Sequence, residues 1–507
     1  MGAFLIVEKM MKNKINNIVI VGGGTAGWMS ASLLAKTQGS NINITLIESE
    51  QIGSIGVGEA TIPPIIHFNE ELGLDPKEFI KETKATIKLG IEFENWGNIG
   101  DKYMHAFGDI GKSFPLCDFN HFWVKAKQEN IDYNFWDFSL NYQTAKLNRF
   151  AALDKIPGLN MGGIAFAFHF DAGLYAKFLR KYSEARGVNR IEGKIVSSEQ
   201  CENTGNVLSV ELENGTKIEG DLFIDCSGIR GLLIEQQLNT GYEDWSHWLP
   251  ADTAIAVPCE SVEPITPYTR SIAHDSGWQW RIPLQHRIGN GMVFSSKHMS
   301  VEDAKQQLMS NLDGKPLADP QVIKFRVGRR LKQWNKNVVS IGLSSGFLEP
   351  LESTSIHLIQ SAVVRLAKMF PHNGITEVMS NEYNRQSKLE YERIRDFIIL
   401  HYKLNNRTDS KFWRDCQRME IPDSLQHKMA VFKASGLVFR ENDELFTKIA
   451  WQQVLIGQGL IPEDYHRSAD QLSAAELKEM LDTLKEIVTK TANQIPLHKD
   501  YIAACYN

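Results

Sequence analysis

The chain has 507 residues, of which 43% are hydrophobic and 23% charged, as expected for a soluble globular protein of two or three domains. Its net charge of −6 gives no support for a nucleic-acid-binding surface. Its six cysteines form no C-x-x-C pair, and no run of about 18 apolar residues could cross a membrane. The sequence therefore predicts a cytoplasmic protein without a disulfide framework, a zinc site or a membrane span.

The first regular segments follow the order strand, glycine turn, helix, strand and acid. Residues 18–21 are apolar and β-branched, which predicts a buried parallel strand. Residues 28–35 have helix-forming composition, and a second apolar strand, 42–47, ends on Glu48. Between the first strand and the helix lies a turn with G-x-G-x-x-G spacing: Gly22, Gly23, Gly24, Thr25, Ala26 and Gly27. This order predicts a Rossmann-like dinucleotide site.

Each part of this motif has a physical role. Gly22 makes the tight turn, Gly24 lets the backbone approach a pyrophosphate, and Gly27 lets helix and strand pack closely. The free N–H groups and the dipole of the helix N-terminus favour phosphate. Glu48 can accept a hydrogen bond from a ribose hydroxyl.

The next segments predict a loop, a helix and a strand. Residues 49–64 are rich in glycine and proline and predict a loop in which the backbone passes close to a ligand. Residues 65–83 predict a helix, and residues 86–96 alternate as one strand with Lys88 opposite its apolar face. Taken alone, this stretch favours a solvent-exposed lysine.

Aromatic residues and further strands follow. The aromatic side chains of residues 103–150 predict either a packed core or an aromatic pocket. Later buried strands are predicted near 220–226, 277–284 and 338–343, and the segment 380–507 is mostly helical by composition.

Five motifs together resemble the flavin-dependent tryptophan (indole) halogenases. The resemblance is dense over residues 17–370. The motifs are Gly22-Gly23-Gly24-Thr25-Ala26-Gly27-Trp28-Met29, Gly56-Val57-Gly58-Glu59-Ala60-Thr61-Ile62-Pro63, Lys88 ahead of Asn95-Trp96, Trp278-Gln279-Trp280-Arg281-Ile282-Pro283, and Glu349-Pro350-Leu351-Glu352-Ser353-Thr354. The resemblance implies an α/β fold, with a Rossmann-like FAD-binding module of the two-dinucleotide-fold flavoprotein type and a mainly helical C-terminal part.

The resemblance also implies a reaction. A separate NAD(P)H-dependent flavin reductase supplies FADH2, which with O2 and a halide ion (chloride or bromide) yields hypohalous acid. The acid passes to Lys88, and electrophilic halogen is delivered to an indole or another electron-rich aromatic. Glu352 matches the family's catalytic carboxylate, which polarises the oxidant or takes the ring proton.

The remaining site residues are carried over by position from the family motifs. Thr354 and Ser355 match the halide site, although many family members have glycine where this chain has Ser355. Trp278 and Trp280 match the tunnel wall, and Ser353 accompanies Glu352. His105 and Phe107 match the pair that sandwiches the indole. The predicted flavin contacts are the glycine-turn residues, Glu48, Ser49, Ile52, Val57, Ala60, Leu343 and Ile356.

The C-terminal part departs from the family pattern. Halogenases of free tryptophan carry a tyrosine pair, a glutamate and a Phe-Trp pair that grip the substrate. Residues 436–447 contain no tyrosine pair, and Phe446 stands in for the gripping tryptophan to within a residue or two. We therefore predict a substrate other than free tryptophan: a bare indole, another aromatic or a larger indole-bearing molecule.

The resemblance divides the chain into three parts. Residues 1–16 form an N-terminal extension. Residues 17–370 form the FAD-binding module, with substrate-binding segments inserted at about 65–160 and 235–330. Residues 371–507 form a helical part that closes the substrate site. The family also allows for a homodimer.

Two alternatives remain open. A flavin monooxygenase that hydroxylates an aromatic ring would usually carry a G-D motif after its last flavin-binding strand, whereas this chain has Gly342-Leu343-Ser344-Ser345. A nucleotide-binding protein without catalysis would leave Lys88, Glu352 and the tryptophan pair without a chemical role.

Overall fold

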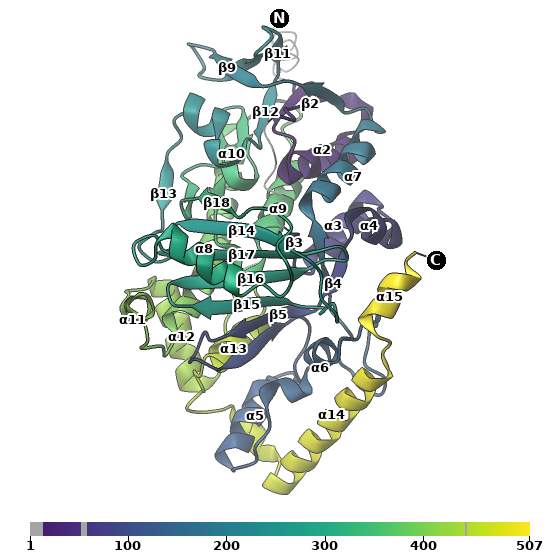
Figure 1. The fold of residues 1–507 in the computed structure, drawn as a ribbon, viewed down its shortest axis with the longest axis vertical. Helices are drawn as coiled ribbons and strands as arrows, with labels where there is room; N and C mark the ends of the chain where they lie inside the picture. Colours follow the sequence, from purple (N-terminus) through teal and green to yellow (C-terminus); the bar gives the residue numbers. More distant parts are fainter. Residues whose placement is uncertain (1–13, 52–57, 442–443, 507) are drawn as a thin grey trace, which may run out of the picture.

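The protein is built on a six-stranded sheet, seen at the top of Figure 1. The computed structural model describes residues 14–51, 58–441 and 444–506. The strands lie in the order β20-β21-β12-β1-β2-β8, and all pair in parallel except β20. Their bounds are β1 (Asn17–Val21), β2 (Asn43–Glu48), β8 (Asn189–Glu192), β12 (Leu222–Asp225), β20 (Trp334–Asn335) and β21 (Val338–Ser340).

Successive side chains of β1 point alternately into two hydrophobic cores, one on each face of the sheet. Ile18 and Ile20 lie in the main core with Trp28, whereas Val19 and Val21 lie in a second core on the other face. The main-core face carries α2 (Thr25–Gln38), which packs against α7 (Ala172–Glu184) and α9 (Ser355–Lys368). The second face is covered by the antiparallel strands β9 (Ile195–Gln200), β10 (Val207–Leu212) and β11 (Lys217–Glu219). The predicted Rossmann-like unit is therefore confirmed.

A seven-stranded sheet lies in the middle of the molecule and joins two distant parts of the chain (Figure 1). Its order is β18-β14-β17-β16-β15-β5-β6, and β5 pairs in parallel with β15. Its strands are β5 (Gly90–Glu94), β6 (Lys102–Ala106), β14 (Thr253–Cys259), β15 (Thr269–His274), β16 (Gly277–Pro283), β17 (Ile288–Phe294) and β18 (Gln321–Lys324). Strands β5 and β6, which precede β12 in the chain, thus meet strands β14 to β18, which follow β12, in one layer.

The single strand predicted for 86–96 is wrong, because the chain changes sheets at Leu89. β4 (Thr86–Lys88) pairs with β7 (Ala167–Asp171), which also pairs with β3 (Gly58–Ala60) inside the predicted glycine-rich loop. The Leu89 N–H donates to the Pro267 carbonyl, and the chain then enters β5. This break leaves Lys88 at the end of a short strand. A further small sheet holds β13 (Tyr242–Asp244), β19 (Gly328–Arg330) and β22 (Gly346–Phe347).

The helix predicted for 65–83 is two helices, α3 (Pro64–Leu72) and α4 (Pro76–Thr83). Gly73 ends α3 with a left-handed φ of 73°, a conformation that glycine adopts without steric cost. The Asp75 side chain then caps α4 by accepting from the Glu78 N–H, with Pro76 at the first helical position.

The C-terminal part is helical, as predicted, and continues to the lower end of the molecule in Figure 1. Its helices are α10 (Glu377–Lys403), α11 (Lys411–Arg418), α12 (Asp423–Ser435), α13 (Lys448–Gly457), α14 (Ala474–Gln494) and α15 (His498–Ala504). The other helices are α5 (Phe119–Gln128), α6 (Leu140–Lys146) and α8 (Val301–Ser310). α13 packs on β6, and α14 packs on α5 and α6. In the described part of the chain, no helix is long and apolar enough to cross a membrane.

Candidate active site

Gly22, Gly23 and Gly27 of the glycine turn leave no room for a side chain, whereas a Cβ on Gly24 would meet no atom within 4 Å. A Cβ on Gly27 would lie 1.9 Å from the Gly22 carbonyl oxygen, and one on Gly23 would lie 1.7 Å from Glu48 Oε2. Gly22 itself has a φ of 111° and donates from its N–H to the Ile47 carbonyl. Gly24, at the N-cap of α2, offers no side-chain cap. The first N–H groups of α2 are therefore free of side-chain acceptors and suited to a phosphate.

Glu48 is held by three donors. Trp28 Nε1 donates to its Oε2 at 3.2 Å, and Arg180 donates to its Oε1 at 3.4 Å. Arg190 also forms a hydrogen bond and an ion pair with Oε1. These contacts fix the carboxylate beside the glycine turn, where it lines a large cavity.

The cavity has a volume of about 1010 Å³ and extends from the glycine turn to the tryptophan pair of β16. Such a volume is large enough for a dinucleotide cofactor. Among the predicted flavin contacts that the structure describes, every one except Gly27 lines it, while Ile52 and Val57 lie outside the described residues. The uncapped helix end and the glycine cradle therefore fit FAD.

Trp278 and Trp280 form part of the far wall of this cavity. Their ring centroids are 6.1 Å apart. The Trp278 Nε1–H donates to Glu349 Oε2 at 2.9 Å, and the Tyr402 hydroxyl donates to the same oxygen at 2.6 Å. Burial raises the pKa of Glu349 to about 7. Sequence analysis did not single out Glu349 or Tyr402, which together fix the orientation of Trp278.

Lys88 adjoins the cavity through Ser353, which lines it. Lys88 is fully buried, and its Nζ donates to Ser353 Oγ at 2.7 Å and lies 5.4 Å from the Phe107 ring centroid. Burial lowers the pKa of the Lys88 amine to about 7, and the negative charge of Glu352 offsets part of this effect. The prediction of a solvent-exposed lysine from the local stretch is therefore wrong, because three-dimensional packing covers both faces of β4.

Ser353 lies at the border between the cavity and Lys88. It lines the cavity and also accepts the Lys88 hydrogen bond. Its φ of 58° is left-handed, an uncommon conformation for a serine, and it follows a short 3-10 helix, Pro350–Glu352. The strained backbone conformation of Ser353 therefore lies at the edge of the cavity, and strain of this kind is typical of functional sites.

The N-terminus of α9 comes directly after Ser353. Thr354 occupies the N-cap position without a side-chain cap, and its buried Oγ1 has no hydrogen-bond partner among the described residues. Ser355 lines the cavity, whereas Thr354 lies behind it. The positive end of the α9 dipole and this free hydroxyl favour a small anion.

Glu352 is enclosed by two imidazoles. His105 Nδ1 donates to Oε2 at 2.7 Å, and His401 Nε2 lies 2.8 Å from Oε1. Burial alone would raise the pKa of Glu352, but the charges and hydrogen bonds of His105 and His401 lower it to about 2. His401, on α10, was missed by sequence analysis because no motif surrounds it.

The predicted aromatic pair and Phe446 meet next to Glu352. The His105 ring centroid lies 6.4 Å from that of Phe107 and 6.2 Å from that of Phe446. Phe446 stacks on Phe397 at 3.8 Å, and Phe397 contacts Trp451 edge-to-face at 4.8 Å. Sequence analysis did not single out Phe397 and Trp451, which lie in the segment that it described only as mostly helical.

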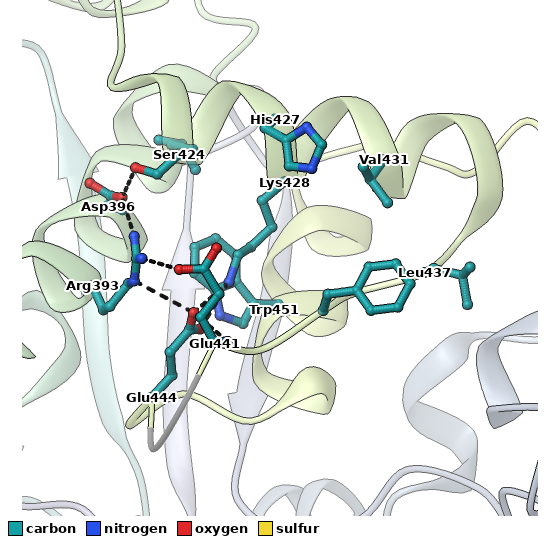
Figure 2. Close-up of a pocket in the computed structure, with 12 residues that line it drawn as sticks. Arg393, Asp396, Ser424, His427, Lys428, Val431, Leu437, Glu441, Glu444 and Trp451 are labelled. Atoms are coloured by element: carbon teal, nitrogen blue, oxygen red, sulfur yellow. Dashed lines mark hydrogen bonds and ion pairs between the residues drawn. The ribbon is translucent and has the colours of Figure 1, made fainter. Parts of the chain in front are cut away.

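A small pocket of about 100 Å³ lies beyond Trp451 (Figure 2). The Lys428 Nζ lies 4.4 Å from the Trp451 ring centroid and donates to Glu444 Oε2 at 2.8 Å. Arg393 forms ion pairs with Glu441 and, at 3.7 Å, with Glu444. Both glutamates of this segment are therefore neutralised by cations of the protein itself.

The fold and the site together define a class of protein. A Rossmann-like cavity has two tryptophans in its wall, and a buried lysine that is hydrogen-bonded to a lining serine lies near a buried carboxylate. These features are those of a flavin-dependent halogenase.

Comparison with known proteins gives the family. The family model for tryptophan halogenase matches residues 17–474, and the chain belongs to this family. It is 34% identical to the tryptophan 7-halogenase RebH of Lentzea aerocolonigenes, over 89% of this chain and 91% of that protein.

Two solved structures share the fold over nearly the whole chain. Xcc4156, a flavin-dependent halogenase from Xanthomonas campestris, is 47% identical with a TM-score of 0.94, covering 97% of this chain and 98% of that one. BrvH, a flavin-dependent halogenase from Brevundimonas sp. BAL3, is 42% identical with a TM-score of 0.93, covering 97% and 99%. These relatives do not favour the hydroxylase alternative.

Proposed function

We propose that this halogenase uses Lys88 to deliver electrophilic halogen to an indole or a similar electron-rich aromatic that is not free tryptophan. Reduced FAD, supplied by a separate NAD(P)H-dependent reductase, provides the oxidant from O2 and chloride or bromide when it is bound. The residues that would hold FAD are the glycine turn, Glu48 and the other described cavity contacts. Thr354 and Ser355 would hold the halide at the α9 N-terminus.

The observation that carries the proposal is the 2.7 Å hydrogen bond from the buried Lys88 amine to Ser353. Because Ser353 lines the cavity that would hold the cofactor, this bond supports a role for the amine in receiving the oxidant. An amine with a pKa of about 7 is about half unprotonated at neutral pH, so it can form a haloamine or hold hypohalous acid by a hydrogen bond.

Glu352 and the tryptophans have complementary roles. With a pKa of about 2, Glu352 stays ionised and can take the proton that the ring loses on substitution. Trp278 and Trp280 separate the cavity from the Lys88 side, which keeps the aromatic substrate away from the cofactor and prevents its direct hydroxylation.

The choice of substrate rests on the segment beside Phe446. Recognition of a free amino acid needs an unpaired carboxylate for the ammonium group. Glu444 is already paired with Lys428 and Arg393, and Glu441 with Arg393, so an ammonium group would have to displace a protein cation. RebH, named for tryptophan, is 34% identical, whereas Xcc4156 and BrvH, above 40%, are named only as flavin-dependent halogenases.

A product assay tests this function. The protein, FAD, a flavin reductase with NADH, and bromide or chloride are incubated with indole or with tryptophan, and products are identified by mass spectrometry. Catalase and a scavenger of free hypohalous acid control for chemistry in solution. We expect halogenated indole from the wild type, with a kcat/KM for indole at least tenfold above that for tryptophan.

Two lysine variants identify the site. Lys88→Met should abolish the product, whereas Lys77→Met, which removes an exposed lysine of α4, should keep wild-type rates. Product from Lys88→Met that survives the scavenger would refute the role of Lys88. A hydroxylated product would restore the monooxygenase alternative, and a preference for tryptophan would refute the substrate argument.

A further inference from the structure

A chain of hydrogen bonds behind Glu352 fixes where the protons lie. The Gln458 Nε2–H donates to the His401 carbonyl oxygen at 2.8 Å, so the Gln458 Oε1 must face Tyr103. The Tyr103 hydroxyl donates to this Oε1 at 3.0 Å and also lies 2.9 Å from His401 Nδ1. A hydroxyl has one hydrogen, so it must accept from His401 Nδ1, which therefore carries a proton.

The opposite nitrogen of His401 faces Glu352. Its Nε2 lies 2.8 Å from Glu352 Oε1, and two lone pairs cannot face each other at this distance without a proton between them. With Nδ1 already protonated and Glu352 ionised, the pair is imidazolium with carboxylate and has a net charge of zero. Burial lowers the pKa of His401, and the hydrogen bond and charge of Glu352 oppose this effect.

The Lys88 amine responds to this charge. It is buried beside Glu352, so a full negative charge on Glu352 favours the ammonium form. We propose that His401, held by Tyr103 and Gln458, neutralises Glu352 and thereby keeps a larger share of the Lys88 amine unprotonated at neutral pH. His401 is thus a positioning and charge-setting residue that acts through Glu352, and this inference rests on the proposed function of Lys88.

Two other imidazoles lie near this cluster, and both stay in place in every variant tested below. His105, on β6, donates from Nδ1 to the second oxygen of Glu352 and, like His401, lowers the pKa of that carboxyl. Thr86 Oγ1 donates to the Pro283 carbonyl and so accepts from His169 Nδ1. His169 Nε2 then accepts from Thr269, and the ring on β7 is neutral. Burial lowers the pKa of His169 well below its ordinary value.

The test removes one hydroxyl. In Tyr103→Phe the His401 Nδ1–H loses its acceptor, so the ring changes to the neutral tautomer with its proton on Nε2. Glu352 then keeps its full charge, and the pKa of Lys88 should rise by roughly one unit. The Phe ring keeps the stacking contact with Phe93 at 4.9 Å, and Tyr142→Phe, whose ring also packs near Trp136, is the matched control.

The readout does not require turnover. Cyanate carbamylates unprotonated amines through its conjugate acid, isocyanic acid, so at constant total cyanate the labelling rate of an amine falls as the pH rises past the pKa of that amine. Labelling of the Lys88 peptide is followed by mass spectrometry across pH 5.5–10 without flavin or substrate. We expect a labelling midpoint about one pH unit higher in Tyr103→Phe than in the wild type, and no change in Tyr142→Phe. His401→Gln, which can donate to Glu352 without carrying the extra proton, should show the same upward displacement.

The second measurement is the pH profile of kcat. If cyanate does not reach Lys88, this profile by itself decides the test. Its acid limb should move to higher pH by the same amount in Tyr103→Phe and His401→Gln. Unchanged midpoints or limbs in both variants would overturn the inference even if the wild type halogenates indole. A wild type that labels as expected but gives no halogenated product would instead overturn the proposed function and leave the charge relation standing.

Discussion

Replacing Lys88 by methionine should stabilise the fold while removing activity. The fully buried amine has its pKa lowered from 10.5 to about 7, which corresponds to roughly 4 to 5 kcal/mol of unfavourable burial of the charged form. Methionine has a similar length and carries no charge. It loses the hydrogen bond to Ser353, worth about 1 kcal/mol. At pH 7 we therefore expect Lys88→Met to raise the unfolding free energy by about 3 kcal/mol.

The effect should depend on pH with a defined sign. Between pH 7 and 10.5 the unfolded chain holds a proton on Lys88 that the folded chain lacks, so wild-type stability rises with pH in this window. The free-energy cost of burying the Lys88 amine is absent above pH 10.5 and complete below pH 7. At pH 9 it should be roughly 2 kcal/mol smaller than at pH 7, and the advantage of the methionine variant should shrink accordingly.

Lys125 provides a matched contrast. It is also buried, but its Nζ donates to the carbonyl oxygens of Ala469 at 3.1 Å and Leu472 at 2.6 Å. Lys125→Met would leave these carbonyls without their donor and should lower the unfolding free energy by about 2 kcal/mol. Urea unfolding of the three proteins at pH 7 and pH 9 measures both effects. A Lys88→Met protein that is less stable than the wild type at pH 7 would refute the view of Lys88 as a strained, functional lysine.

Three other variants test separate parts of the site. Gly23→Ala should weaken FAD binding at least tenfold, because its Cβ would displace the Glu48 carboxylate, and a fluorescence titration with FAD would contradict this if the affinity stayed the same. The Nε2 of His498 accepts from the Ile87 N–H, and burial lowers the pKa of His498 to about 4. The free energy of unfolding should therefore fall by roughly 3 kcal/mol as the pH falls from 6.5 to 4, and His498→Gln should reduce this fall in urea unfolding. Glu352→Gln should lower kcat at least a hundredfold, whereas Glu349→Gln should stay within a fewfold of the wild type; equal losses in this assay would show that the two carboxylates are not distinguished.

The part of the site that would hold the cofactor is predicted well from the sequence, because the residues that form it are close together in the chain. The strand, the glycine turn and Glu48 lie within about 30 consecutive residues, and close packing explains three of the glycines: Gly22 against Cys226, Gly23 against Glu48 and Gly27 against Gly22. The same reasoning placed one strand where the structure has two, because the hydrogen bond from Leu89 to Pro267 depends on a segment far along the chain.

The lysine half could not be predicted from local pattern. Lys88 and Ser353 are 265 residues apart in sequence, and only the family motifs connected them. His401 lies in the last turn of the long helix α10 and carries no motif, although it contacts Glu352 directly. Its role depends on Tyr103, on β6, and on Gln458, the C-cap residue of α13. Such a constellation follows from tertiary packing, which composition and periodicity do not encode.

Two carboxylates on one turn acquire opposite properties from their partners. Glu349 and Glu352 are both fully buried, yet the pKa of the first rises to about 7 and that of the second falls to about 2. Glu349 receives hydrogen bonds from a neutral indole and a neutral phenol, which compensate burial only in part. Glu352 faces two imidazoles that can carry positive charge. The difference between the two pKa values indicates different roles for the two carboxyl groups. Glu349 can hold Trp278 as a neutral acid, and Glu352 is the carboxylate that can accept the proton that the aromatic ring loses.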